Sequence, residues 1–249
     1  MKAAAAVAVA LIGASCGSHP PDMTACIPPG TIAIASLDLD RLRSAPIYAK
    51  LPQSVLAFAD AYRDAHQLLL AWSGTDLLII ARGSVPGGTT VAPNLTVTGS
   101  PDSIRAAIAQ YGTGKPGVPT LLDYAKKTAG GVPLWIAIQG GISLPLTGNT
   151  RNLNRLLRDL DYATAAATLD SAITLRLTAQ SRSAEGANQF DQNLRAILSL
   201  ASAAEARNAS LATLLNSVQI HRDTLTTRAT LTIPGAAVNT LLQPLNRTF

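Results

Sequence analysis

One serine in this chain has the surroundings of a nucleophile. Ser143 lies in Gly141-Ile142-Ser143-Leu144-Pro145, directly after an apolar run that is typical of a strand. Hydrolases expose a reactive serine on such a turn, where the pattern is Gly-x-Ser-x-Gly. Pro145 takes the place of the last glycine, and no helical pattern follows the serine. A surface turn is therefore the preferred interpretation, and an envelope serine hydrolase is an alternative.

The base and the acid of such a hydrolase would come from elsewhere in the chain. Of the three histidines, His19 and His66 precede the serine and only His221 follows it, which is the usual order. Asp159 or Asp161 could orient the imidazole, but their spacing does not single them out. We therefore predict no catalytic residue and a non-enzymatic protein.

A glycine-rich string, Gly112-Thr113-Gly114-Lys115-Pro116-Gly117, matches the Gly-x-Gly-x-x-Gly pattern of dinucleotide-binding loops. That pattern has to follow a strand and open a helix, because the helix N-terminus binds the pyrophosphate. Here it follows a helical segment and contains a proline. We predict a plain linker.

Three arginines share one face of an expected helix. Arg151, Arg155 and Arg158 recur at i, i+4 and i+7, where they could meet anionic lipid head groups or a phosphate. Asp159 and Asp161 are near enough in sequence to pair with them. A solvated face of an amphipathic helix explains the pattern as well, and we prefer that interpretation.

Composition limits the partners. The chain has 249 residues, a net charge of +5 spread along its length, and only 4% aromatic residues. There is no basic run and no series of stacking rings, so we predict no nucleic-acid partner. Two cysteines and three scattered histidines have no zinc-binding spacing, so we predict no metal and no cofactor.

The N-terminus has the pattern of an export signal. Lys2 precedes an apolar stretch over residues 3–12, which is half the length of about 20 residues that a membrane-spanning helix needs. We therefore expect a signal peptide over 1–15 and no membrane-spanning helix.

Small residues then lead to a cysteine, in Gly13-Ala14-Ser15-Cys16, and this segment resembles the lipobox of bacterial lipoproteins. The resemblance implies lipidation of Cys16 and a protein anchored to a membrane of the bacterial cell envelope, facing the periplasm or the exterior. In the alternative, ordinary cleavage leaves Cys16 free to pair with Cys26 in a soluble periplasmic or secreted protein.

A polar tether is expected over 16–27, followed by a first patterned segment over 28–140. Period-two and continuous apolar runs predict strands over 31–39, 67–72, 76–82, 94–99 and 133–139. Helical spacing predicts helices over 53–64, 101–111 and 121–128 and a short helix capped by Asp40. Ser100 caps the second of these, and 83–90 is a flexible break.

A second segment, 150–243, follows a stretch rich in Gly, Ser and Pro. Helices are expected over 151–160, 183–201, 211–215 and after Pro234, and hairpin strands over 162–169, 172–180, 218–222 and 225–233. The two halves look related, and they form either separate units or one continuous domain.

Because hairpins join most strands, the sequence predicts an α+β fold with a mostly antiparallel sheet and helices packed on one face. Trp72 and Trp135 are expected in the core. Eight further strand residues are expected to be buried, namely Leu68, Leu70, Leu78, Ile80, Ile136, Leu175, Leu177 and Leu231.

The segment Ile27–Leu51 and the later run Leu77–Gly83 are similar to uncharacterised exported bacterial proteins of α+β type. That resemblance implies no activity. The sequence thus favours a lipid-anchored globular protein that binds a partner, either a protein or an apolar ligand, or supports the envelope. The alternatives are the serine hydrolase and a carrier that holds a lipid between helices and sheet, which a deep apolar cavity would favour.

Overall fold

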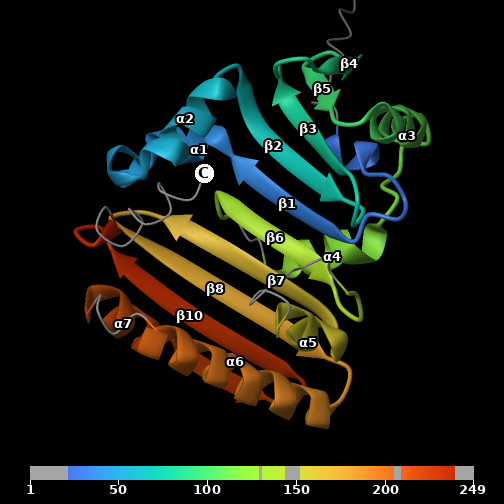
Figure 1. Ribbon diagram of the computed structural model, residues 1–249. Coiled ribbons are helices and arrows are strands. Elements are labelled where there is room, and N and C mark those ends of the chain that lie inside the picture. The colour runs from blue at the N-terminus through green and yellow to red at the C-terminus, as the bar shows by residue number, and fades with distance from the viewer. Residues whose placement is uncertain (1–21, 129–130, 144–151, 205–208, 239–249) are drawn as a thin grey trace, which may run out of the picture.

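A ten-stranded antiparallel sheet runs through the protein (Figure 1). The structure is a computed structural model that describes residues 22–128, 131–143, 152–204 and 209–238. The strands are β1 (Ala33–Asp38), β2 (Ala65–Trp72), β3 (Leu77–Gly83), β4 (Thr89–Ala92), β5 (Leu95–Thr98), β6 (Leu134–Gln139), β7 (Leu160–Leu169), β8 (Ala172–Ser181), β9 (Gln219–Asp223) and β10 (Thr226–Pro234). Their order across the sheet is β4-β5-β3-β2-β1-β6-β7-β8-β10-β9. The predicted α+β class with an antiparallel sheet is confirmed.

Strand β1 joins the two halves of the sheet. Ala35 pairs with Leu70 of β2 on one side and with Ile136 of β6 on the other, and both pairings are antiparallel. β6 in turn pairs with β7 of the second half. The segments 28–140 and 150–243 therefore contribute to one continuous sheet.

The strand register assigns alternate side chains to two faces of the sheet. We define the front face by the row Ala35, Ile136, Ala165, Leu177 and Ala229, and the rear face as the opposite side. The front face is turned toward the viewer in Figure 1.

Helices cover both faces in the first half of the sheet. On the front, α1 (Leu39–Ser44), the 3-10 turn η2 (Tyr48–Lys50) and α2 (Gln53–Ala61) pack on β1 to β3. On the rear, the 3-10 turn η1 (Met23–Cys26), α3 (Pro101–Tyr111) and α4 (Pro119–Thr128) pack on the same strands and on β6. Continuous apolar runs such as Leu68-Leu69-Leu70 put hydrophobic side chains on both faces, and each face needs a cover.

The three described helices that belong to the second half lie on the front face, while α4 of the first half contacts the rear of β7 through Tyr124 and Tyr162. The three are α5 (Asn152–Arg158), α6 (Ala184–Ala204) and α7 (Ala209–Asn216). The rear face of β8 and β10 carries Thr174, Thr178 and Arg228, in keeping with the strict alternation of their sequences. The expected packing of helices on one face thus describes β8 and β10, whereas the first half is covered on both sides and α4 reaches the rear of β7.

Side-chain caps begin two of the helices, and one of the two predicted caps is wrong. Ser100 caps α3, since its side chain accepts a hydrogen bond from the backbone N–H of Ser103 at 3.2 Å, and Pro101 begins the helix as predicted. For α1 the cap is Asp38, whose carboxylate accepts from the backbone N–H of Arg41 at 2.9 Å, and not the predicted Asp40. Asp40 lies one residue inside the helix.

The segment expected as a flexible break contains the start of a strand. β4 begins at Thr89 and pairs with β5 across a turn at Asn94, whose φ is +61°. Asn tolerates this left-handed conformation better than most residues, so the pair Pro93-Asn94 can close a hairpin. The glycines at 87 and 88 obscured the strand signal in the sequence.

The predicted tether is shorter than expected. Met23, Ala25, Cys26 and Ile27 are all buried, and η1 packs against α3 and β3. Gly117 adds a hydrogen bond to this packing of the N-terminal segment, because its backbone N–H donates to the carbonyl of Ile27 at 2.9 Å. Residues from Asp22 onward therefore belong to the folded domain, and the N-terminal segment through 21 lies outside the described residues.

Cys26 should be almost inert toward alkylating reagents in the native protein. Burial of its thiol, with a smaller contribution from Asp22, raises the pKa from 9.0 to about 11. Since the thiolate is the nucleophile, only about one thiol in a thousand is reactive at pH 8. In a Cys16→Ala chain, we expect iodoacetamide to label native Cys26 at least about a hundredfold more slowly than the urea-unfolded chain. Comparable rates in both states would contradict this burial.

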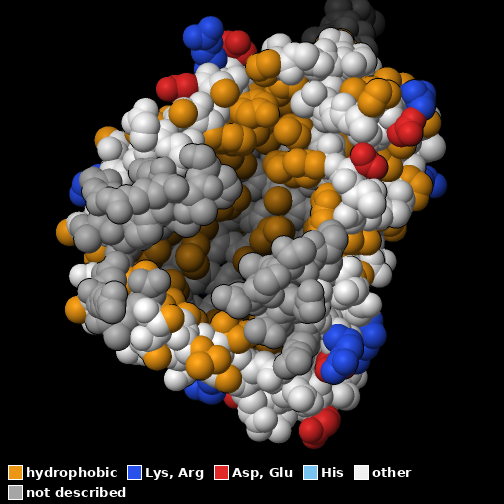
Figure 2. Space-filling view, in the orientation of Figure 1, with side chains coloured by type: hydrophobic (Ala, Val, Ile, Leu, Met, Phe, Trp, Pro, Cys, Tyr) orange, Lys and Arg blue, Asp and Glu red, His pale blue; other side chains and the backbone are white. Residues whose placement is uncertain are grey.

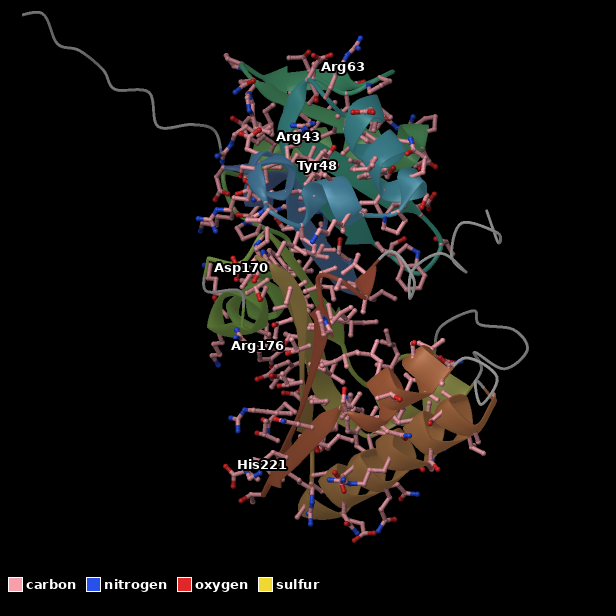
Figure 3. All side chains as sticks on the ribbon, turned by 90° about the vertical axis from the view of Figure 1, so that its left-hand side faces the viewer. Arg43, Tyr48, Arg63, Asp170, Arg176 and His221 are labelled. Carbon is pink, nitrogen blue, oxygen red and sulfur yellow. The ribbon has the colours of Figure 1, made fainter. Side chains whose placement is uncertain are left out.

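Arg43 ties three segments of the front layer together. Its guanidinium donates to the carbonyls of Ala59, Tyr62 and Ala65 at 3.1, 2.9 and 3.0 Å, so it caps the C-terminus of α2 and holds the start of β2. Figure 3 shows Arg43 beside Tyr48 in this layer.

Replacement of Arg43 by Met keeps the aliphatic stem and removes these hydrogen bonds. We expect a loss of about 2 kcal/mol in the free energy of unfolding, measured by urea denaturation. Arg105→Met is the control, because Arg105 makes only an exposed ion pair with Asp102, and a loss below about 0.5 kcal/mol is expected. Equal effects of the two substitutions would contradict the capping role.

The eight strand residues that were expected to be buried differ in their exposure. Leu68, Leu78 and Ile80 are buried, and Leu70, Leu177 and Leu231 are half-buried, as are Trp72 and Trp135. Ile136 and Leu175 contradict the prediction, with 42% and 39% of their surface exposed. Both lie on the front face near the middle of the sheet, where the helices leave a gap.

Candidate functional site

The structure separates the residues of the hydrolase hypothesis. Ser143 is exposed after the end of β6, and His221 lies on β9 with β7, β8 and β10 between the two strands. Strands about 4.8 Å apart place β6 and β9 about 19 Å from each other. His66 lies at the other end of β1, where its Nδ1 is 3.0 Å from Asp40. Asp161 accepts a hydrogen bond from the hydroxyl of Tyr124.

The remaining patterns singled out in the sequence do not converge. Gly112–Gly117 connects α3 to α4, as a linker would. Arg158 is exposed, 3.9 Å from Asp159, whereas Arg151 and the side chain of Arg155 lie outside the described residues, as does Cys16. Among the described ranges, no group of three His, Cys, Asp or Glu side chains is arranged to hold a metal ion.

The strongest feature is a gap between two helical units on the front face. α1 and α2 lie over β1 to β3, and α6 contacts β8, β10 and β9. The front of β6 and β7 lies between these units, so Leu134 and Ile136 remain 39% and 42% exposed. Figure 2 shows this region as a hollow with hydrophobic side chains inside it.

This hollow, which we name the trough, has a volume of about 530 Å³. Its floor comes from front-face residues of β1, β6, β7, β8 and β10, and α6 provides one wall. The bordering residues are Ala35, Leu134, Trp135, Ile136, Ala165, Ala166, Ala167, Leu175, Arg176, Leu177, Leu194, Leu198, Val218, Ala229, Thr230 and Leu231.

Alanines on β7 create the depth of the trough. The front side of this strand carries only methyl groups, from Ala163, Ala165 and Ala167. Leucine and isoleucine side chains stand opposite them on both neighbouring strands, Leu134 and Ile136 on β6 and Leu175 and Leu177 on β8. A row of short side chains between two rows of long ones forms a channel along the strand.

Two core clusters close the ends of this channel. At one end, Leu160 and Ala163 pack with Phe190 of α6. At the other end, Leu169 and Ile173 pack with the cluster formed by α1, η2 and α7. As far as the described residues go, the trough is therefore open mainly toward the front.

The trough offers a ligand almost no polar group. Arg176 and Thr230 are the polar residues that border it, and the register places both side chains on the rear face. Figure 3 shows Arg176 projecting away from the side of the sheet on which α6 and α7 lie. The backbone groups of the floor are paired between β6, β7 and β8. Such a surface can bind a ligand only through apolar contact.

Comparison with known proteins gives a likeness to solved structures only. No protein-family model matches the chain, and no curated protein matches it. Two crystal forms of TP0453 are similar, each at 10% identity over 90% of this chain. The TM-scores are 0.49 for form I, with 97% of that chain covered, and 0.46 for form IV, with 96% covered.

Sequence reasoning missed the trough because it treated every apolar strand residue as core. One signal was available in the β7 segment Tyr162-Ala163-Thr164-Ala165-Ala166-Ala167-Thr168. Its front positions are all alanine, although a central strand covered by helices usually carries larger side chains there. Three alanines in a row on one face of such a strand indicate room for something else.

Proposed function

We propose that this protein is an exported, non-enzymatic binding protein that holds the hydrocarbon chain of an amphiphile in the trough. The observation that carries the proposal is the exposure of Leu134, Ile136 and Leu175, at 39%, 42% and 39%, on the two strands that flank the alanine row of β7. A soluble protein rarely leaves such large apolar side chains in a concave, contiguous patch unless a ligand or partner covers them.

The dimensions favour a chain over a larger occupant. β6 and β8 lie two strand spacings apart, about 9.6 Å, and their long side chains narrow the space above β7 further. A helix has a diameter of about 10–12 Å and does not enter such a channel. An extended peptide would lose its hydrogen bonds to water, and the floor offers none in return.

The predicted lipid anchor supports the same proposal. A lipoprotein of the cell envelope works beside a bilayer, which supplies amphiphiles with hydrocarbon chains. No helix within the described residues is long and apolar enough to cross a membrane. We propose on the lipobox resemblance alone that Cys16 carries the anchor, and intact mass of the native mature protein tests it: an acyl-bearing Cys16 is expected, and a Cys16–Cys26 disulfide would contradict it.

Titration with a fatty acid that carries an environment-sensitive fluorophore at the end of its chain tests chain binding. The delipidated mature protein should enhance the fluorescence saturably with one site per molecule, and an unlabelled fatty acid should displace the probe. Absence of saturable enhancement would contradict the proposal.

A further inference from the structure

The residues that close the two ends of the trough determine its length. On the front face of β7, Ala163 and Leu169 are six residues apart, which is about 20 Å along a strand. Phe190 of α6 packs with Ala163 at one end. At the other end, Leu169 packs into the cluster formed by α1, η2 and α7. Ala165 and Ala167 lie between these two contacts and border the open part of the trough.

The distance between the two ends suits a short hydrocarbon chain. Van der Waals contact with the closing side chains takes about 3.5 Å at each end, which leaves about 13 Å for a ligand. An extended saturated chain advances about 1.25 Å per carbon, because its C–C bonds of about 1.5 Å follow a zigzag. The trough therefore accommodates about 10 to 12 carbons in a straight line along β7.

The volume of the trough limits the number of chains. A methylene group fills about 27 Å³, which is close to the share of one water molecule in the liquid. The volume of about 530 Å³ thus corresponds to about 20 methylene groups. One chain of about 12 carbons fits within it, whereas two chains of about 16 carbons each would need roughly 860 Å³.

We infer that the trough selects amphiphiles with a single hydrocarbon chain of about 12 carbons, such as a medium-chain fatty acid or a lysophospholipid. This inference rests on the proposed chain binding in the trough and adds a limit on the number and length of chains. Since apolar side chains close both ends, the polar head leaves through the open front. Phe190 and Leu169 are then the residues that set the chain length.

A series of saturated fatty acids, from octanoic to octadecanoic acid, tests the length limit in competition with the fluorescent fatty acid. All acids are used below the concentrations at which they form micelles. Each buried methylene group strengthens binding about fourfold, so the Kd should fall by that factor per carbon up to about dodecanoic acid. Further carbons stay outside the trough, so the Kd should then remain level within about twofold.

Removal of the Phe190 ring should lengthen the preferred chain. Phe190→Ala opens about 5 Å at one end, so the Kd should become level only at about hexadecanoic acid. Phe58→Ala is the matched control, because Phe58 is 39% exposed on α2 and lies outside the lining of the trough. Its Kd values should become level at dodecanoic acid, as in the parent chain.

A second variant changes the length in the opposite direction and keeps the test decisive if Phe190→Ala does not fold. Ala167→Leu adds three carbons beside Leu169, at the other end of the trough. The Kd should then become level at about decanoic acid, two carbons earlier than in the parent chain. Circular dichroism and the melting temperature establish that each variant is folded.

Native mass spectrometry after gel filtration measures the number of chains. Mature protein mixed with dodecanoyl lysophosphatidylcholine should retain one lipid per molecule. Protein mixed with vesicles of dipalmitoyl phosphatidylcholine should retain none, because the trough cannot hold both chains. A stable complex with the diacyl lipid would overturn the single-chain limit.

The outcomes of the fatty-acid series separate the length limit from the proposed function. A Kd that keeps falling about fourfold per carbon through octadecanoic acid would overturn the length limit and leave chain binding in the trough standing. The same holds if the folded variants level at the same acid as the parent chain. Failure of every acid to compete with the probe would overturn both proposals.

Discussion

Replacement of Ala165 by Phe is expected to weaken binding of a fatty-acid probe roughly fiftyfold. Ala165 lies in the middle of the alanine row, and its side chain points to the front face. A phenyl ring there fills the channel between Ile136 and Leu177. A ligand chain that loses about 100 Å² of apolar contact loses about 2.5 kcal/mol, which corresponds to that change in Kd.

The matched control is Thr178→Phe, which adds a ring to β8 on the opposite face. It should leave the Kd unchanged within about twofold, because the added ring points away from the trough. Ala165→Phe itself should fold normally, since the ring enters an open apolar channel and displaces no side chain. Unchanged binding by Ala165→Phe, with circular dichroism and melting temperature like those of the parent chain, would refute the placement of the ligand.

Two isoleucines on opposite faces of the sheet should differ sharply in their contribution to stability. Ile80 on β3 is fully buried among Ile34, Leu95 and Val97, and Ile80→Ala should lower the free energy of unfolding by about 4 kcal/mol. Ile136 on β6 is 42% exposed at the trough, so Ile136→Ala should cost only about 1 kcal/mol.

Urea denaturation of the delipidated protein gives both values under the same conditions. The contrast matters because both residues sit in apolar interior strands and look alike in the sequence. A cost for Ile136→Ala as large as that for Ile80→Ala would mean that the trough is filled by protein, and would count against a ligand site. In the presence of a bound fatty acid, the cost of Ile136→Ala should increase, because the ligand stabilises the native state in proportion to its affinity.

Local patterns were sufficient to predict most elements of the fold. Period-two alternation in Ile173 to Gln180 and the cap at Ser100 are local signals, and both appear in the structure as β8 and α3. Hairpin connections likewise implied the antiparallel sheet. These features depend on residues close together in the chain.

The corrections concern contacts between distant segments. Ile136 is exposed because α1 and α6, which belong to different halves, stop short of β6, and no local pattern records how far a helix reaches. The burial of Met23 and Cys26 depends on α3 and β3, which lie far along the chain. A candidate site that forms where helices fail to cover a sheet is therefore hard to predict from sequence. A site built from a local sequence motif is easier to predict.

Photocrosslinking tests the central claim most directly. A fatty acid with a diazirine in the middle of its chain is irradiated with the mature protein, and the modified peptides are identified by mass spectrometry. We predict adducts on the front of β6, β7 and β8 and on α6 near Leu194 and Leu198, which an unlabelled fatty acid competes away and Ala165→Phe suppresses. Adducts confined to the rear face or scattered without competition would contradict the account.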